Sequence, residues 1–177
     1  MRRIVLLMGM TLDGYVAGPK WVTSPPGPEA DHWRRAAAAL AGTHVMGRVT
    51  YLAMAAHWPT STEPEAAPMN DIPKVVFSKS LQRADWQHTR IASGELAAEA
   101  TRLKEENGGD IVAHGGASFA QALVRTGLVD EYRFVVYPCA VGEGLPVFKD
   151  LPETLNLRLI DATPFPTGAL GLVYQPA

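Results

Sequence analysis

Short apolar runs alternate with helical stretches along this chain, and this alternation constrains the fold more than any other feature. Residues 3–10 form a nearly continuous apolar run, typical of a strand that is buried on both faces of a parallel sheet. Similar runs follow at 43–46, 74–78 and 110–114, and less clearly at 88–92. Because parallel strands need crossover helices, the order predicts an α/β fold with a mostly parallel central sheet and helices on both faces.

Helices are expected in alanine-rich or amphipathic stretches; the first begins with proline and acids, and all but the second end at glycine. These stretches cover residues 24–42, 48–58, 94–109 and 117–127. Three strand patterns then follow without helices, at 131–138, 155–165 and 169–175, and the last two predict an antiparallel C-terminal hairpin with its turn at 166–168. The polar and proline-rich segment 59–73 is expected to be an exposed, mobile loop, and residues 11–21 and 140–148 are expected to be loops.

Composition narrows the class of protein. The chain of 177 residues predicts one domain spanning 1–177, and 47% hydrophobic with 19% charged residues is a globular balance. A net charge of -2 gives no basic excess for nucleic acid or an anionic membrane. The single cysteine excludes an internal disulfide and fits a reducing compartment, and no apolar run approaches the ~18 residues of a membrane span. We expect a soluble, cytoplasmic protein.

Two turns carry the strongest chemical signal. In "HVMGRVTY" (44–51) and in "IVAHGGAS" (111–118), a strand runs into glycine and a helix begins at once. A helix N-terminus attracts anions, and glycine lets a phosphate approach the backbone closely. Hydroxyl and cationic side chains stand beside these turns or at the end of another strand: Arg48, Thr50, Ser78, Lys79 and Ser118. Together they could hold a pyrophosphate and one further phosphate, as NADPH offers.

Simpler interpretations remain open at this point. A single strand–glycine–helix turn is more often only a tight turn, and Arg48 or Lys79 could be solvated surface charges. The chain has neither the G-x-G-x-x-G pattern of the usual dinucleotide fold nor the G-x-x-x-x-G-K-[ST] loop of a nucleotide kinase. The five histidines lack metal-binding spacing, so we expect no metal. Trp21, Trp33 and Trp58 could line a flat pocket or simply pack in the core.

Five motifs in a fixed order extend these signals over nearly the whole chain. They are "MTLDGYVAG", "VMGRVTY", "VVFSKSL", "HGGASFAQALVRTGLVDEYRFVVYP" and "GEGLPVF". With them the chain resembles the dihydrofolate reductase-like superfamily, in the branch that includes the reductase domain of bacterial riboflavin biosynthesis. The resemblance implies an NADPH-dependent reductase that acts on a C=N bond or a ribosylamino carbon of a pterin-like or aminopyrimidine substrate. It also implies a homodimer.

The resemblance implies cofactor-binding residues by position. Val16, Ala17 and Gly18 would lie beside the nicotinamide, near the backbone at Gly9. Gly47, Arg48, Val49 and Thr50 would hold the phosphates on the adenosine side, with Ser78 and Lys79 beside the 2′-phosphate. Gly115, Gly116, Ala117 and Ser118 would surround the pyrophosphate.

Hydride transfer to an imine carbon needs a proton at the nitrogen, and a carboxyl group with a raised pKa in a partly dry pocket suits that task. In dihydrofolate reductases an acid near the start of the first helix pairs with the pteridine, and Asp31 stands at a similar place. Asp31 is therefore the predicted catalytic residue, as a proton donor or as a partner of the cation that forms. A purely structural pair with Arg35 and a catalytic Asp13 are the alternatives.

Two functions stay open from the sequence. One is the NADPH-dependent reductase. The other is a module that keeps the NADPH cleft without turnover. The segments after "GRVTY" and around "PKWV" lack the Asp-Asp-Pro stretch of the riboflavin reductases and the proline–tryptophan pair of true dihydrofolate reductases, so the substrate stays undefined.

Overall fold

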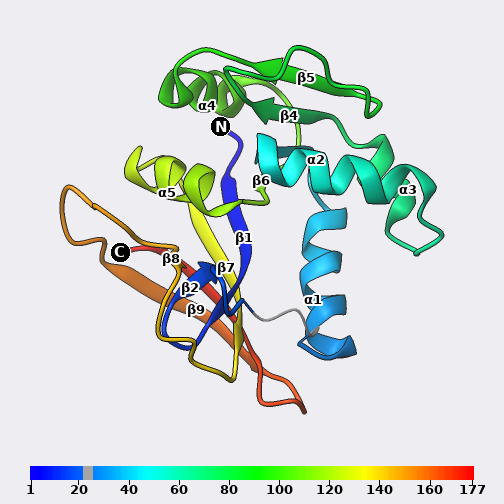
Figure 1. Ribbon diagram of the computed structural model, residues 1–177. Coiled ribbons are helices and arrows are strands. Elements are labelled where there is room, and N and C mark those ends of the chain that lie inside the picture. Colours follow the sequence, from blue (N-terminus) through cyan, green and yellow to red (C-terminus); the bar gives the residue numbers. More distant parts are fainter. Residues whose placement is uncertain (22–25) are drawn as a thin grey trace.

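The computed structural model describes residues 1–21 and 26–177 and contains one large sheet (Figure 1). Its eight strands run in the order β5-β4-β3-β6-β1-β7-β10-β9. Neighbours from β5 to β7 pair in parallel, whereas β10 pairs antiparallel with both β7 and β9. The predicted α/β class, with its C-terminal hairpin, is confirmed.

The elements have the following bounds. The strands are β1 (Ile4–Thr11), β2 (Tyr15–Ala17), β3 (Thr43–Gly47), β4 (Lys74–Phe77), β5 (Thr89–Ala92), β6 (Ile111–Ala113), β7 (Glu131–Tyr137), β8 (Leu145–Pro146), β9 (Leu157–Pro164) and β10 (Leu170–Pro176). The helices are α1 (Pro28–Ala39), α2 (Arg48–His57), η1 (Trp58–Thr60), α3 (Ala66–Asp71), α4 (Leu96–Glu105) and α5 (Ala117–Arg125). No helix in these described ranges is long and apolar enough to cross a membrane.

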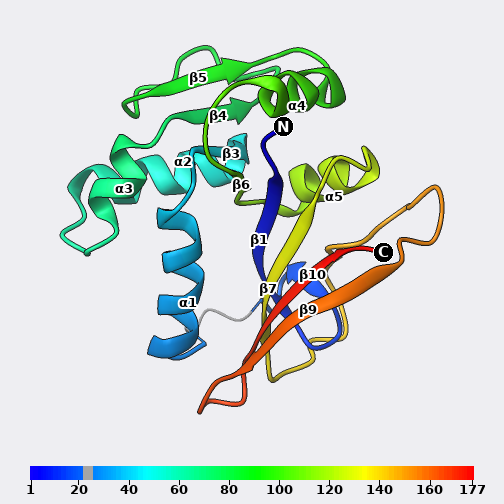
Figure 2. The same ribbon diagram turned by 180° about the vertical axis from the view of Figure 1, so that it is seen from behind.

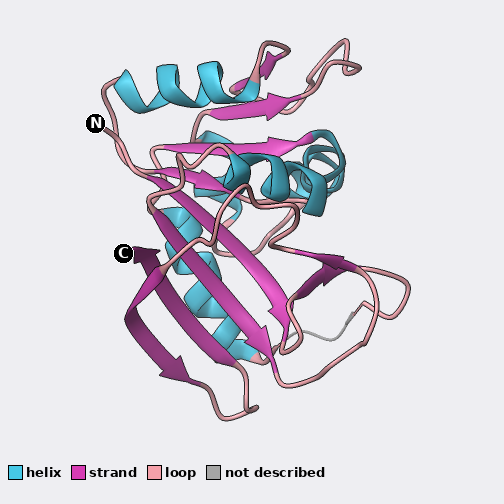
Figure 3. Ribbon diagram, turned by 90° about the vertical axis from the view of Figure 1, so that its left-hand side faces the viewer, coloured by secondary structure: helices cyan, strands magenta, loops and turns pink. Residues whose placement is uncertain are grey.

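Side chains of β1 divide between two cores, one on each face of the sheet. Ile4, Leu6 and Met8 pack with apolar residues of α4 and α5, whereas Val5 and Leu7 pack with those of α1 and α2. Figures 1 and 2 show α1 and α5 on opposite sides of β1, and Figure 3 shows α1 behind the strands when the sheet is viewed from the α5 side. Burial on both faces explains why the sequence of β1 is continuously apolar rather than alternating.

Three segments that the sequence predicts to be loops, 11–21, 59–73 and 140–148, contain regular structure. The stretch 59–73 holds most of η1 and all of α3, and Met69 on α3 is only 3% exposed. The stretch 11–21 holds β2, which pairs antiparallel with β8. Proline and polar residues concealed the short helix, while three residues are too few to show a strand pattern. The helix expected from Ser24 has its start outside the described residues, and α1 begins at Pro28.

Lys74 fixes the end of α3 from within the core. Lys74 is 1% exposed, and its Nζ donates hydrogen bonds to the carbonyl oxygens of Met69, Asn70 and Ile72 at 3.1, 2.7 and 2.8 Å. The ammonium also lies 4.5 Å from the centre of the Trp86 ring. Carbonyl groups at a helix end need donors, and one buried cation supplies several here.

Lys74→Met should therefore lower the free energy of unfolding by about 2 kcal/mol or more, because three carbonyl groups lose their donor. Lys79→Met is the control, since that side chain is 75% exposed and its loss should stay within about 0.5 kcal/mol. Urea unfolding measures both values. Equal stability of the two variants would show that the hydrogen bonds of Lys74 do not hold α3.

Candidate functional site

Both glycine turns lie at one edge of the sheet, where the parallel strands end. Gly47 closes β3, and Gly115 and Gly116 follow β6, which pairs with β3. The Gly47 N–H donates a hydrogen bond of 3.2 Å to the Gly115 carbonyl oxygen, and the peptide bond between Gly115 and Gly116 is cis. The carboxyl end of the strands is where open α/β sheets bind ligands. The two turns therefore form one continuous backbone surface.

The first cavity lies between the starts of α2 and α5 and has a volume of about 490 Å³. We call it the α2–α5 cavity. It is lined by Val16, Ala17, Gly47, Arg48, Val49, Phe77, Gly116, Ala117, Ser118, Phe119 and Leu145. Both helices begin at a glycine, and no side chain of the described residues caps either start. Free N–H groups of two helix ends thus face one cavity, an arrangement that favours anions.

The second cavity lies between α1 and α2 and has a volume of about 480 Å³. We call it the α1–α2 cavity. It is lined by Leu7, Met8, Gly9, Val16, Trp21, Arg34, Arg35, Thr50, Ala53, Met54, His57, Trp58, His114 and Gly116. Val16 and Gly116 line both cavities, so the two spaces adjoin at these residues. Apolar walls with a few polar groups are typical of small-molecule sites.

Most of the predicted cofactor residues meet at these cavities. Eight of them line the α2–α5 cavity: Val16, Ala17, Gly47, Arg48, Val49, Gly116, Ala117 and Ser118. Gly116 lines both cavities, and Thr50 lines the α1–α2 cavity instead. Trp21 and Trp58 also line the α1–α2 cavity, as the sequence allowed, but Trp33 packs against Phe165 with ring centres 6.4 Å apart.

The remaining predicted residues line neither cavity. Gly18 packs on backbone, since a Cβ there would lie 2.8 Å from the Gly144 Cα. Gly115 packs beneath the turn, where a Cβ would lie 2.7 Å from the Met8 Cε. The Ser78 hydroxyl accepts hydrogen bonds from two backbone N–H groups of its own turn. The exposed Lys79 places its Nζ 3.4 Å from the Glu95 Oε1. Phe77 pairs with Gly47, and both residues line the α2–α5 cavity. Lys79 follows Phe77 by two residues, so the turn that holds Lys79 borders this cavity.

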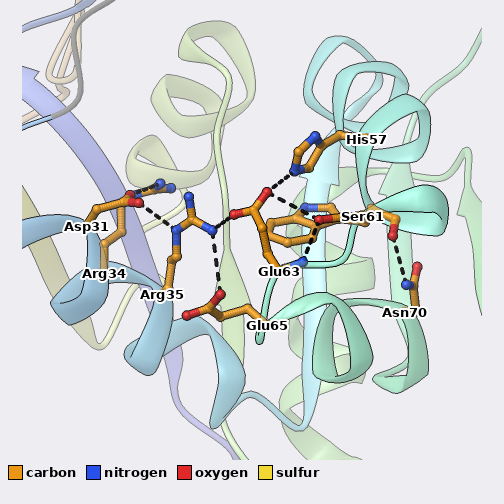
Figure 4. Close-up of polar contacts among 9 residues, drawn as sticks. Asp31, Arg34, Arg35, His57, Ser61, Glu63, Glu65 and Asn70 are labelled. Atoms are coloured by element: carbon orange, nitrogen blue, oxygen red, sulfur yellow. Dashed lines mark hydrogen bonds and ion pairs between the residues drawn. The ribbon is translucent and has the colours of Figure 1, made fainter. Parts of the chain in front are cut away.

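Asp31 belongs to a polar network between α1 and the segment before α3 (Figure 4). Its two carboxylate oxygens accept hydrogen bonds from Arg34 at 2.7 Å and from Arg35 at 2.6 Å. Figure 4 shows Arg35 between Asp31 on one side and Glu63 and Glu65 on the other. Arg34 and Arg35 line the α1–α2 cavity, whereas Asp31 stands behind them.

The charges around Asp31 favour its ionised form. Burial alone would raise the pKa of the Asp31 carboxyl, but the hydrogen bonds and charges of Arg34 and Arg35 outweigh it and hold the pKa below its usual value. Asp31 is therefore an anion at neutral pH. This is the reverse of the raised pKa expected for a stored proton, and the cations that the geometry pairs with Asp31 are Arg34 and Arg35.

Asp13, the alternative acid, organises a turn. Its carboxylate accepts hydrogen bonds from the Thr11 hydroxyl at 2.6 Å and from the Val141 and Gly142 N–H groups at 3.0 and 2.8 Å. These bonds, led by the one from Thr11, lower the pKa of Asp13. Asp13 thus ties the loop after β1 to the glycine-rich loop before β8 and lines neither cavity.

His44 and His114 form a pair on the floor of the site. The His44 Nδ1 and His114 Nε2 atoms lie 2.8 Å apart, with His44 fully buried and His114 lining the α1–α2 cavity. Burial, followed by the charges of His114 and Lys74, lowers the pKa of His44 to about 2. Burial, followed by Arg34, lowers the pKa of His114 to about 4. Both rings are therefore neutral at pH 7.

Sequence reasoning missed several residues that line the cavities. Arg34 lies one helical turn after Asp31, which is the only sequence signal that could have revealed its position. Phe119 and Leu145 line the α2–α5 cavity from α5 and β8, and Met54 lines the other cavity from α2. Their apolar character is common to all core residues, so no sequence pattern distinguishes them.

Comparison with known proteins matches this architecture. The RibD C-terminal domain family matches residues 2–170. The uncharacterized protein YyaP of Bacillus subtilis (strain 168) is 29% identical over 183 residues, which cover 98% of this chain and 95% of YyaP. Among solved structures, RibD of Acinetobacter baumannii has a TM-score of 0.75 at 16% identity, covering 100% of this chain and 58% of RibD. A dihydrofolate reductase of Enterococcus faecalis complexed with NADP(H) has a TM-score of 0.69 at 12% identity, covering 98% and 96% of the two chains.

The histidine pair predicts how stability depends on pH. The folded-state pKa values of about 2 and about 4 lie below the ordinary 6.5, so unfolding takes up protons as the pH falls below about 6.5. Between pH 7.5 and 5 the wild type should lose about 4 kcal/mol more unfolding free energy than the double variant His44→Asn plus His114→Asn, because each histidine contributes about 1.4 kcal/mol per pH unit below 6.5. The other three histidines, His32, His57 and His88, remain in both proteins. Parallel pH curves from urea unfolding would contradict the lowered pKa values.

Proposed function

The chain belongs to the RibD C-terminal domain family, and we propose that it is an NADPH-dependent reductase acting on a C=N bond or a ribosylamino carbon of a pterin-like or aminopyrimidine substrate. Reductases are found both in this family and among proteins of this fold. The observation that carries the proposal is the pair of adjoining cavities that share Val16 and Gly116. One cavity would hold the cofactor and the other the substrate, with the reacting carbons meeting at the shared residues.

The α2–α5 cavity fits the cofactor. At Gly116 an added Cβ would meet only the Thr50 Oγ1, at an ordinary contact distance of 3.5 Å, so the backbone there is not covered by close packing. The starts of α2 and α5, together with the Ser118 hydroxyl and Arg48, would bind the phosphates, and Lys79 at its border would pair with the 2′-phosphate. NADPH, when bound, supplies the hydride. Val16 and Ala17 would hold the nicotinamide at the junction of the cavities.

The α1–α2 cavity favours a reductase over a module that only binds NADPH. Such a module needs no second space beside the nicotinamide, yet this cavity of about 480 Å³ adjoins it. The Trp21 and Trp58 rings give it flat apolar walls, which suit a heterocycle. Arg34 contributes a cation to the same cavity, which suits a substrate that carries an anionic group.

Asp31 is proposed as the acid that serves catalysis, in the role of partner to the cation that forms and not in the role of proton donor. As an anion behind Arg34 and Arg35, it would act through its charge, without touching the substrate, on the positive charge that develops on the substrate nitrogen during hydride transfer. It also orients Arg34 and Arg35 at the wall of the α1–α2 cavity. Both contributions lie on the substrate side, away from the α2–α5 cavity.

A homodimer is proposed through the free edge of β9. This strand ends the sheet in the part of the chain that the structure describes, and Leu159 and Ile160 on it are 51% and 43% exposed. An exposed apolar edge strand is a template for pairing with another chain. Sedimentation should show a dimer that Leu159→Lys plus Ile160→Lys converts to a monomer. A monomeric wild type would refute the proposal.

The cofactor assignment predicts a preference for NADPH over NADH. Arg48→Ala plus Lys79→Ala should remove most of that preference, since losing a charged phosphate contact costs about 1–3 kcal/mol. Lys149→Ala plus Arg158→Ala is the control, because both residues are exposed and line neither cavity. Fluorescence titration gives the affinities of each protein for NADPH and for NADH. Equal binding of the two cofactors by the wild type would remove the basis for the assignment.

The Asp31 assignment predicts a loss confined to turnover. Asp31→Asn should reduce the turnover of 7,8-dihydrofolate or 5-amino-6-(5-phosphoribosylamino)uracil about 100-fold, whichever is accepted, while NADPH affinity hardly changes. The loss should shrink in acid, where the substrate nitrogen is already protonated and its positive charge depends less on the anion. Glu29→Gln, in the same first turn of α1, is the control and should be fully active. If Asp31 serves only its pair with Arg35, the variant would be about 0.3–0.5 kcal/mol less stable and equally active.

A further inference from the structure

The structure limits which ring nitrogens of the His44 and His114 pair can carry protons. One hydrogen bond of 2.8 Å joins the His44 Nδ1 and the His114 Nε2, so only one of these two nitrogens carries the proton. The second ring nitrogen of His44, Nε2, is fully buried and has no hydrogen-bond partner within the described residues. The second nitrogen of His114, Nδ1, belongs to a ring that lines the α1–α2 cavity. The neutral rings therefore have two possible arrangements.

In the first arrangement His114 donates from Nε2, and the proton of His44 then sits on its Nε2. That choice buries an N–H group without an acceptor, which folded proteins rarely tolerate. In the second arrangement His44 donates from Nδ1 and leaves only a lone pair at its buried Nε2. His114 then accepts at Nε2 and must carry its own proton on Nδ1.

Charges on the neighbouring strand and helix favour neutral rings, and the buried Nε2 of His44 selects the second arrangement. Lys74 on β4 pairs in register with His44 on β3, and its charge acts on the His44 ring. Arg34 on α1 is the charged group that acts on His114, and no carboxylate of the described residues accepts a hydrogen bond from either ring. The pair therefore stays neutral and keeps one orientation.

We propose that His44 fixes His114 as an Nδ1–H hydrogen-bond donor to an acceptor atom of the substrate, a ring carbonyl oxygen or an imine nitrogen. His114 is then a substrate-contacting residue, and His44 is a positioning residue that acts through it. The proposal rests on the proposed function, because it places the substrate in the α1–α2 cavity. It adds a requirement for the substrate class: the ring must present an acceptor, not an amino group, at this point.

The position of His114 connects this donor to the reacting bond. His114 precedes the diglycine turn, and Gly116 is one of the two residues at which the cavities adjoin. An acceptor bound to His114 would lie close to the carbon that receives the hydride. A fixed donor there withdraws electron density from a conjugated C=N or C=O group without reorganising during the reaction.

Nitrogen NMR tests the proton positions without any ligand. Long-range proton–nitrogen correlation spectra at pH 7 should show His44 and His114 as neutral rings, each protonated at Nδ1. The spectra of His44→Asn and His114→Asn assign the two signals, and the other three histidines serve as references. A His114 ring protonated at Nε2, or a charged pair, would overturn the proposal.

Two substitutions at one position test the function of the donor. His114→Asn keeps an amide N–H group where Nδ1 stands, whereas His114→Gln reaches toward His44 and leaves no donor at the cavity. With 7,8-dihydrofolate or 5-amino-6-(5-phosphoribosylamino)uracil, kcat/KM should fall about 10-fold to 100-fold in His114→Gln and only a few-fold in His114→Asn. Equal values in both variants and the wild type would overturn the proposal.

The same experiments separate this inference from the proposed function. NADPH affinity should be unchanged in both variants, because His114 is absent from the α2–α5 cavity. Absence of NADPH binding in the wild type would refute the reductase, and the NMR spectra would still decide the proton positions. Normal NADPH binding and turnover with a His114 protonated at Nε2 would refute only the inference.

Discussion

The hydrogen bond from the Gly47 N–H to the Gly115 carbonyl joins the two turns on which the whole site depends. It follows from the parallel pairing of β3 with β6, which ends both strands at the same edge and starts α2 and α5 side by side. Glycine is required where the turns pack most closely. A Cβ at Gly47 would lie 2.9 Å from the Phe119 Cβ, and Gly115 has a positive φ of 81°. One backbone arrangement thus sets the position of both cavities.

The two cavities differ in how they are built. The α2–α5 cavity offers mainly backbone and exposed side chains, which suits a ligand recognised by its phosphates. The α1–α2 cavity is bordered by a fixed polar framework: Asp31 holds Arg34 and Arg35, and Arg35 connects α1 to Glu63 and Glu65 (Figure 4). Beneath this framework lies a neutral histidine pair. Such rigidity on the substrate side is what orienting a reacting ring requires.

Much of the fold and most of the lining of the α2–α5 cavity could be predicted from the sequence. Apolar runs, glycine stops and the order of elements reveal backbone geometry, and a ligand site made of backbone follows directly from it. The short elements β2 and α3 could not be predicted, because β2 has only three residues and α3 is held by the buried Lys74 from outside the helix. Tertiary contacts of this kind leave no local pattern.

The substrate side was harder for the same reason. Asp31 was singled out by its place in α1, but its lowered pKa depends on where Arg34 and Arg35 point. His44 and His114 are 70 residues apart, and only the parallel pairing of β3 and β6 brings their rings together. Sequence spacing therefore identified a candidate acid without its ionisation state, and it gave no sign of the histidine pair.

The most direct test of the account is a crystal structure of the protein with NADP⁺. The account predicts that the phosphates lie against the starts of α2 and α5, and that the nicotinamide ring contacts Val16 and Gly116 and faces the α1–α2 cavity. A nicotinamide directed away from that cavity, or a cofactor bound at another place on the sheet, would contradict it.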